Sequence, residues 1–136
     1  MRFAVKAEVT DTGASAFVFA AQKTMYGGKA IAVGDVVYLF ASENEGGPGL
    51  VARAVVTAAA PVPRLPGVER QTPRVDVALA CTARVKRRLG RAGLKPFADW
   101  TDGRPETELN FKLYRQATNK VVGLSDAAAA FLDTHF

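Results

Sequence analysis

The sequence predicts a mixed α+β, β-rich protein, built as a small open β-barrel with short helices at its ends. Five or six apolar segments have the length of strands, and turns rich in glycine and proline separate them. The long amphipathic helices that connect parallel strands are missing from the pattern. With 136 residues, the chain has the size of one common domain, which buries roughly two thirds of its unfolded surface. We therefore expect residues 1–136 to form a single domain.

Each expected strand is marked by alternation of apolar and polar residues or by a short apolar run. A tight turn at Gly34 and Asp35 precedes one of them. The longest begins with Val75, Val77 and Leu79 at a spacing of two, which indicates one buried face. The expected strands cover residues 3–9, 16–22, 36–41, 50–58 and 74–89, and a short sixth strand ends the segment 117–124.

The segments between the strands carry turn and helix signals. Residues 60–67 hold three prolines, which predict an irregular connection. Residues 90–100 predict one helical turn, whereas residues 107–116 fit a helix or a strand. Ser125 is a residue type that favours the helix N-cap. We therefore expect a short helix after it that buries its apolar side chains.

The net charge of +5 lies in the second half of the chain. Residues 1–63 hold five basic and five acidic residues, and residues 64–136 hold thirteen basic and eight acidic ones. The excess is densest in residues 82–95, which have six basic residues and no acidic one. This asymmetry suits a partner that carries phosphates. It is equally typical of a solvated strand edge, which lysine and arginine protect against aggregation.

The single cysteine and the single histidine restrict the other kinds of site. Cys81 has no partner for an intramolecular disulfide, and one cysteine with one histidine cannot form a zinc-type cluster. The sequence therefore predicts no metal and no cofactor, in a reducing, cytoplasmic setting. No segment approaches the roughly 20 apolar residues of a membrane span, so we expect no membrane partner.

Two stretches resemble the EVE domains of the PUA-like superfamily, to which the YTH and ASCH domains also belong. They are AIAVGDVVYLFASENEGGPGLVARAVV, residues 30–56, and LYRQATNKVVGLSDAAAAFL, residues 113–132. The positions that match the EVE pattern are Gly34, Asp35, Ser42, Gly49, Val51, Ala52, Arg115, Gln116 and Ser125. The chain departs from that pattern at Phe17 and Phe19, where EVE domains usually have a tryptophan strand, and it lacks the ASCH motif GxKxxExR. The resemblance implies a divergent PUA-like barrel that binds nucleic acid, with a modified base held in a pocket.

Such a pocket requires an aromatic face for stacking and groups that hydrogen-bond the edge of the base. The candidates are Tyr26, Ser42, Asn44, Arg53 and Trp100. Each also has a structural interpretation, because the aromatic residues can belong to the core and serine and asparagine are ordinary turn formers. Arg53 interrupts an apolar strand, so it faces either a ligand or the solvent. We expect Phe17 and Phe111 in the core.

Basic residues near this pocket are candidates for contacts with the phosphate backbone. The first set is Lys23, Arg115 and Lys120. A second patch contains Arg84, Lys86 and Arg88, with Arg87 between them, and the first three share one face of the expected strand 74–89. Spaced in this way, they can follow a phosphate backbone. Alternatively, they form the solvent face of that strand.

Two other classes of function remain open. A hydrolase or nuclease would use the loop carboxylates Glu43 and Glu45, or Asp99 and Asp102. A nucleophile needs a nearby base, however, and His135 stands near the end of the chain, where segments fray. A domain that binds a small ligand or a protein would use the same barrel mouth. The function that the sequence and the resemblance predict together is a non-catalytic module that binds DNA or RNA.

Overall fold

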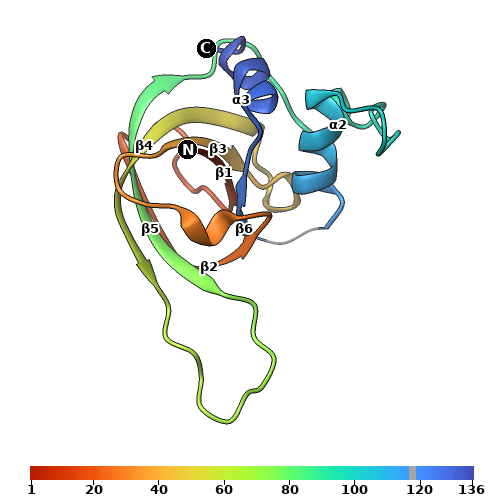
Figure 1. Cartoon of the computed structure of the whole chain (residues 1–136). Coiled ribbons are helices and arrows are strands. Elements are labelled where there is room, and N and C mark those ends of the chain that lie inside the picture. The colour runs from red at the N-terminus through yellow and green to blue at the C-terminus, as the bar shows by residue number, and fades with distance from the viewer. Residues whose placement is uncertain (117–118) are drawn as a thin grey trace.

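The computed structural model describes residues 1–116 and 119–136. Within these ranges, six strands form a barrel in the order β1-β3-β4-β5-β2-β6 (Figure 1). The strands are β1 (Arg2–Ala7), β2 (Ala16–Met25), β3 (Val36–Ala41), β4 (Gly49–Pro61), β5 (Arg74–Arg84) and β6 (Lys120–Gly123). The predicted β-barrel is confirmed, but it is closed rather than open. The four-residue strand β6 closes it, because β6 pairs with β1 on one side and with β2 on the other.

In the described residues, short helices connect the strands or follow the last of them. They are η1 (Gly28–Ala30), η2 (Glu43–Glu45), α1 (Arg91–Leu94), α2 (Pro105–Leu109), η3 (Asn110–Tyr114) and α3 (Asp126–Asp133). Figure 1 shows α2 and α3 on the same side of the barrel. The segment that fitted a helix or a strand is helical, because Leu109 and Leu113, four residues apart, both point into the core. Pro105 begins α2 at a position where its missing N–H costs nothing.

The strands β1 and β3 are buried on both faces. Phe3 and Val5 of β1 pack inside the barrel, whereas Ala4 packs outside it against the helices. In β3, Leu39 points inward and Phe40 points toward the helices. Strands with two covered faces are apolar along their whole length. This explains why the segments around β1 and β3 are so rich in apolar residues.

Several strand boundaries differ from those expected from the sequence; β1 ends at Ala7 and β2 continues to Met25, where residues 9 and 22 were expected. The strand β5 ends at Arg84, not at residue 89, because the amides of Lys86 and Arg87 turn away and donate to the His135 carbonyl at 2.7 and 3.1 Å. The strand β4 continues to Pro61, beyond the expected end at residue 58. Between β4 and β5 the chain projects away from the barrel and returns (Figure 1). We call this projection, residues 61–73, the β4–β5 arm.

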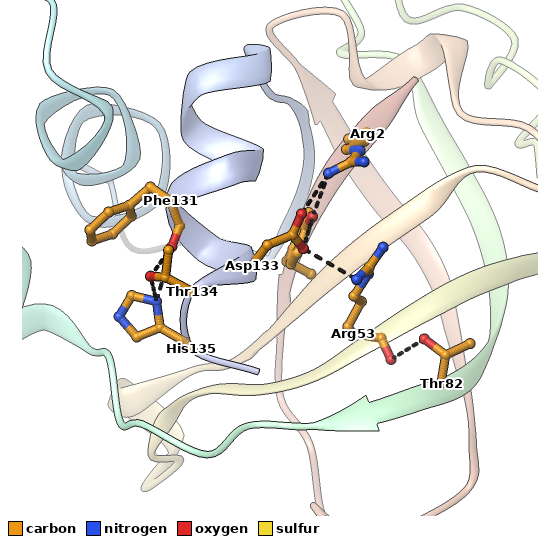
Figure 2. Close-up of polar contacts among 8 residues, drawn as sticks. Arg2, Arg53, Thr82, Phe131, Asp133, Thr134 and His135 are labelled. Atoms are coloured by element: carbon orange, nitrogen blue, oxygen red, sulfur yellow. Dashed lines mark hydrogen bonds and ion pairs between the residues drawn. The ribbon is translucent and has the colours of Figure 1, made fainter.

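The helix α3 is held against the barrel wall by one carboxylate (Figure 2). Asp133 accepts a hydrogen bond from the Tyr38 hydroxyl at 2.6 Å and pairs with Arg2 at 2.8 Å and Arg53 at 3.4 Å. Burial, together with Asp133, raises the pKa of Tyr38 to about 12. At the other end of α3, the Ser125 side chain accepts from the Ala128 amide at 3.1 Å, which confirms the predicted N-cap.

We expect the Asp133→Asn substitution to lower the free energy of unfolding by about 1–2 kcal/mol, because it removes the charged acceptor shared by three donors. Urea unfolding measures this loss. Glu45→Gln is the matched control, since it removes the same charge from an exposed loop carboxylate. Equal losses in the two variants would show that the carboxylate does not hold the helix.

Candidate nucleic-acid interface

Three aromatic rings from separate parts of the chain gather on the outer surface. The Phe111 ring centroid lies 5.8 Å from that of Tyr26 and 5.4 Å from that of Trp100. Tyr26 follows β2, Phe111 belongs to η3, and Trp100 lies in the loop before α2. Tyr26 and Trp100 are 44% and 45% exposed, so both keep a large part of their rings in contact with solvent. We call Tyr26, Phe111 and Trp100 the aromatic cluster.

The backbone fixes Tyr26 in an unusual conformation. The φ angle of Tyr26 is +51°, in a region that residues other than glycine seldom occupy. Gly27 follows with a φ angle of +82°. The Gly123 amide donates to the Tyr26 carbonyl at 3.1 Å and so attaches this turn to β6. Strained backbone of this kind is found preferentially at functional sites. Gly28 then passes so close to Val121 that a Cβ atom would lie 2.1 Å from its carbonyl oxygen.

Cationic side chains lie over these rings. The Arg115 guanidinium is 4.6 Å from the Phe111 centroid and 5.9 Å from the Trp100 centroid. The Lys112 amine is 5.6 Å from the Tyr26 centroid, and it also pairs with Glu108 at 3.1 Å. Arg115 is exposed and forms no ion pair with any residue that the structure describes. Its contacts with the rings are cation–π interactions, which leave its charge available to an anion.

A cleft of about 260 Å³ adjoins the cluster. It is lined by Trp100, Gly103, Arg104, Thr107, Glu108, Phe111 and Lys112. Ligand pockets for drug-sized molecules begin at about 300 Å³. The cleft therefore suits one ring system rather than a large cofactor, and its lining combines the rings of Trp100 and Phe111 with polar side chains of α2.

Ser42 and Asn44 belong to a different cluster, which includes Glu43, Arg91 and Tyr114 of η3. Ser42 is buried, and its amide donates to the Ala7 carbonyl at 2.8 Å. The neighbouring Glu43 carboxylate accepts from the Tyr114 hydroxyl at 3.0 Å and from the Arg91 amide at 2.8 Å. Burial, with the Glu43 charge, raises the pKa of Tyr114.

Asn44 is exposed and faces the Arg91 guanidinium at 3.4 Å. Arg53 lies neither in the aromatic cluster nor beside Ser42 and Asn44. It is on the outer wall, beside Asp133 (Figure 2). The five candidates for the base pocket are therefore distributed among three places, and the structure brings Tyr26 and Trp100 together through Phe111.

A row of basic residues crosses four neighbouring strands at one level of the barrel. In the strand register, Arg74 of β5 is opposite Lys23 of β2, Lys23 is opposite Lys120 of β6, and Lys120 is opposite Lys6 of β1. We call these four residues the basic row. Like charges directly opposite each other destabilise a sheet. Repulsion within the basic row therefore lowers the stability of the sheet, and hydrogen bonds within the protein do not remove this repulsion.

The two central lysines of the row are buried under η3 and the segment after it. Lys6 and Lys120 are each 1% exposed, and their amines donate to the carbonyls of Leu113 at 2.8 Å and Gln116 at 3.3 Å. No carboxylate of the described residues lies within ion-pair distance of either amine. Burial, together with the Lys6 charge, lowers the pKa of Lys120 to about 8, and burial lowers the pKa of Lys6 as well.

Sequence reasoning missed Lys6. The signal was present, because Lys6 is the one charged side chain inside the apolar part of the first strand, where a solvated position would be flanked by further polar residues. Only the packing of η3 onto the outer face of β1 shows that this position is covered.

The second basic patch is not arranged as expected. Because β5 ends at Arg84, the prediction that Arg84, Lys86 and Arg88 share one strand face is wrong. The Arg84 guanidinium is bound to the loop after β1, where it donates to the carbonyls of Thr12, Gly13 and Ala14. Lys86 and Arg88 are exposed in the segment that follows the strand.

The described residues contain no helix long and apolar enough to cross a membrane. They also contain no group of three histidine, cysteine, aspartate or glutamate side chains placed to hold a metal ion.

Comparison of the chain with known proteins matches no family model and no curated protein. Solved structures, in contrast, match over almost the whole chain. The DUF55 domain of human thymocyte nuclear protein 1 superposes with a TM-score of 0.69 at 15% identity, covering 99% of this chain and 98% of that one. Human THYN1 in complex with DNA containing 5-methylcytosine superposes with a TM-score of 0.65 at 16% identity, covering 98% of this chain and 96% of that one. A protein from Pseudomonas putida superposes with a TM-score of 0.63 at 18% identity, and the match covers 98% of each chain. The chain therefore has the barrel fold of these DUF55 structures, in agreement with the resemblance of its sequence to EVE-like domains of the PUA-like superfamily.

Proposed function

We propose that this protein binds nucleic acid without chemical turnover and stacks one base, in a modified form, on the aromatic cluster. The observation that carries the proposal is the grouping of Tyr26 and Trp100, both half-exposed, around Phe111 with the Arg115 guanidinium over the rings. Nucleic-acid-binding proteins combine aromatic platforms for bases with cations for the backbone. A solved structure of the same fold contains DNA with 5-methylcytosine, which supports this choice of ligand.

The energies favour a base that is already unpaired or easily extruded. Taking a base out of a duplex costs a few kcal/mol. Stacking on an aromatic side chain returns about 1–3 kcal/mol per base. A single aromatic cluster thus offsets the cost of extrusion only in part, so a single strand or a weakened base pair is the better substrate, and the cations have to supply the rest of the affinity.

The contacts of the loop carboxylates support binding over catalysis. Glu43 accepts two hydrogen bonds from the protein itself. Asp99 accepts from the Thr101 amide and hydroxyl, and Asp102 accepts from the Arg104 amide and the Thr107 hydroxyl. Carboxylates that hold loops in this way are engaged by the fold. We therefore assign no catalytic role to them.

The test is fluorescence anisotropy with labelled DNA and RNA oligonucleotides, single-stranded and duplex, each with cytosine or 5-methylcytosine, at two salt concentrations. We expect binding at low salt that weakens as salt rises, with tighter binding to the modified strand at both concentrations. Binding that ignores the modification would leave a nucleic-acid-binding module without base recognition. A folded protein that binds none of the oligonucleotides at low salt would overturn the proposal, and a small-ligand role for the cleft would then be tested.

A further inference from the structure

The β4–β5 arm forms one wall of a cleft of about 620 Å³, the other wall being the end of β2. The lining residues are Ala21, Lys23, Pro61, Val62, Pro63, Arg64, Leu65, Arg70, Gln71, Thr72, Pro73 and Arg74. Four of them are basic and none is acidic. A concave surface lined by one sign of charge concentrates the electrostatic field and attracts counter-ions.

The cations of this cleft are not neutralised by the part of the protein that the structure describes. Arg64 donates to the Glu69 carbonyl at 2.9 Å, and Arg74 donates to the Ala21 carbonyl at 2.8 Å. Both acceptors are uncharged. Among the described residues, none of Lys23, Arg64, Arg70 and Arg74 takes part in an ion pair.

The basic row increases the positive charge at the base of the cleft. Lys23 and Arg74 line the cleft, and they are also direct cross-strand neighbours in the sheet. On its other side, Lys23 faces Lys120. Lys23 therefore lies between two like charges, and their repulsion destabilises the protein when no anion occupies the cleft. An anion in the cleft would relieve this repulsion.

The arm is ordered by its own contacts before any ligand binds. Four prolines, Pro61, Pro63, Pro66 and Pro73, restrict its backbone. The Gln71 amide closes the tip, because it donates to the carbonyls of Leu65 and Val68 and accepts from the Leu65 amide, all at 2.8–2.9 Å. A rigid arm loses little conformational freedom when it binds.

The cleft and the aromatic cluster are joined by one strand. Lys23 lies in β2, and Tyr26 follows the end of that strand three residues later. At about 3.3 Å per residue this separates them by about 10 Å. Phosphates in one strand of B-form nucleic acid advance about 3.4 Å along the axis, so about three steps cover the same distance. A strand with one base on the cluster thus reaches the cleft within a few nucleotides.

From these observations we propose that the β4–β5 arm cleft binds the phosphate backbone of the nucleic acid whose base stacks on the aromatic cluster, with Lys23, Arg64, Arg70 and Arg74 as the phosphate-binding residues. This inference rests on the proposed function, and it adds a second contact surface to it.

The test is the dependence of affinity on salt. Each phosphate contact contributes about 0.7 to the slope of log K against log salt for single strands and about 0.9 for duplex DNA. The double substitution Arg64→Gln and Arg70→Gln keeps hydrogen-bonding side chains on the arm and removes two charges. We expect it to reduce the slope by about 1.4–1.8 and to leave the preference between modified and plain strands unchanged.

The matched control removes two exposed charges elsewhere, by Lys29→Gln and Lys95→Gln, and we expect it to keep the wild-type slope. An arm variant with the wild-type slope, or a control variant with the same reduction, would overturn the inference while the proposed function stands. A wild-type protein that binds no oligonucleotide at low salt would overturn the proposed function and the inference together.

Discussion

Replacing Lys120 with methionine should raise the free energy of unfolding at pH 7 by about 2–3 kcal/mol. Lys120 is 1% exposed and faces a second buried lysine, and its amine has one hydrogen bond to the described residues, of 3.3 Å. Its pKa in the folded protein is about 8, against 10.5 for an ordinary lysine. Since one pKa unit corresponds to about 1.4 kcal/mol, the charged amine costs the folded state about 3 kcal/mol. Methionine fills a similar volume without a charge.

The pH dependence of this gain has a definite sign. Between pH 8 and 10.5 the unfolded chain holds the Lys120 proton and the folded chain has lost it, so wild-type stability rises with pH across this window. The methionine variant lacks this contribution. The difference between the two proteins should therefore be largest below pH 8 and should shrink as the pH approaches 10.5.

Urea unfolding of both proteins at pH 7 and pH 10 measures this difference. Lys95→Met is the control, because Lys95 is exposed and lies outside the basic row. Its effect should be small. Two results would show that the buried Lys120 charge does not destabilise the folded protein. One is a variant less stable than wild type at pH 7, and the other is a difference in the free energy of unfolding that does not change with pH.

The Trp100→Ala substitution should weaken binding of the preferred oligonucleotide by about 5- to 150-fold. This range corresponds to the loss of one base–aromatic stacking interaction of about 1–3 kcal/mol. Because Trp100 is 45% exposed and lies in a loop, the loss of its packing on Phe111 should cost less stability than a core truncation. The salt dependence should not change, since tryptophan carries no charge.

Two variants make this measurement specific to stacking. Trp100→Phe keeps an aromatic face and should recover most of the affinity. Val18→Ala removes another exposed apolar side chain, from β2, and should bind as wild type does. Unchanged affinity in Trp100→Ala, or the same loss in Trp100→Phe, would remove Trp100 from the site.

The local patterns of the sequence predicted most of the strands, because alternation and turn residues are local properties. They did not predict closure of the barrel. The four residues of β6 are too short to reveal that they join both β1 and β2. The end of β5 was also misplaced, because the carbonyl that draws Lys86 out of the strand comes from His135, some 50 residues away along the chain.

The candidate site was predicted residue by residue but not as an arrangement. Residue type and sequence neighbours singled out Tyr26 and Trp100 as candidates for the base pocket, and Arg115 was a phosphate candidate that also matches the EVE pattern. Phe111, which we expected in the core, is the residue that brings them together. The basic row was not visible either, because it depends on the register between strands that are distant in the sequence.

The alternation along β1 gives the two covered faces of this strand different chemistry. Phe3, Val5 and Ala7 pack inside the barrel, while Lys6, between Val5 and Ala7, contributes to the basic row on the outer side. Because both faces of β1 are covered, each position accepts only the polarity that its side of the sheet requires. A slip of one residue in the pairing of β1 would carry Lys6 into the apolar interior of the barrel. The basic row therefore disfavours pairing in a wrong register.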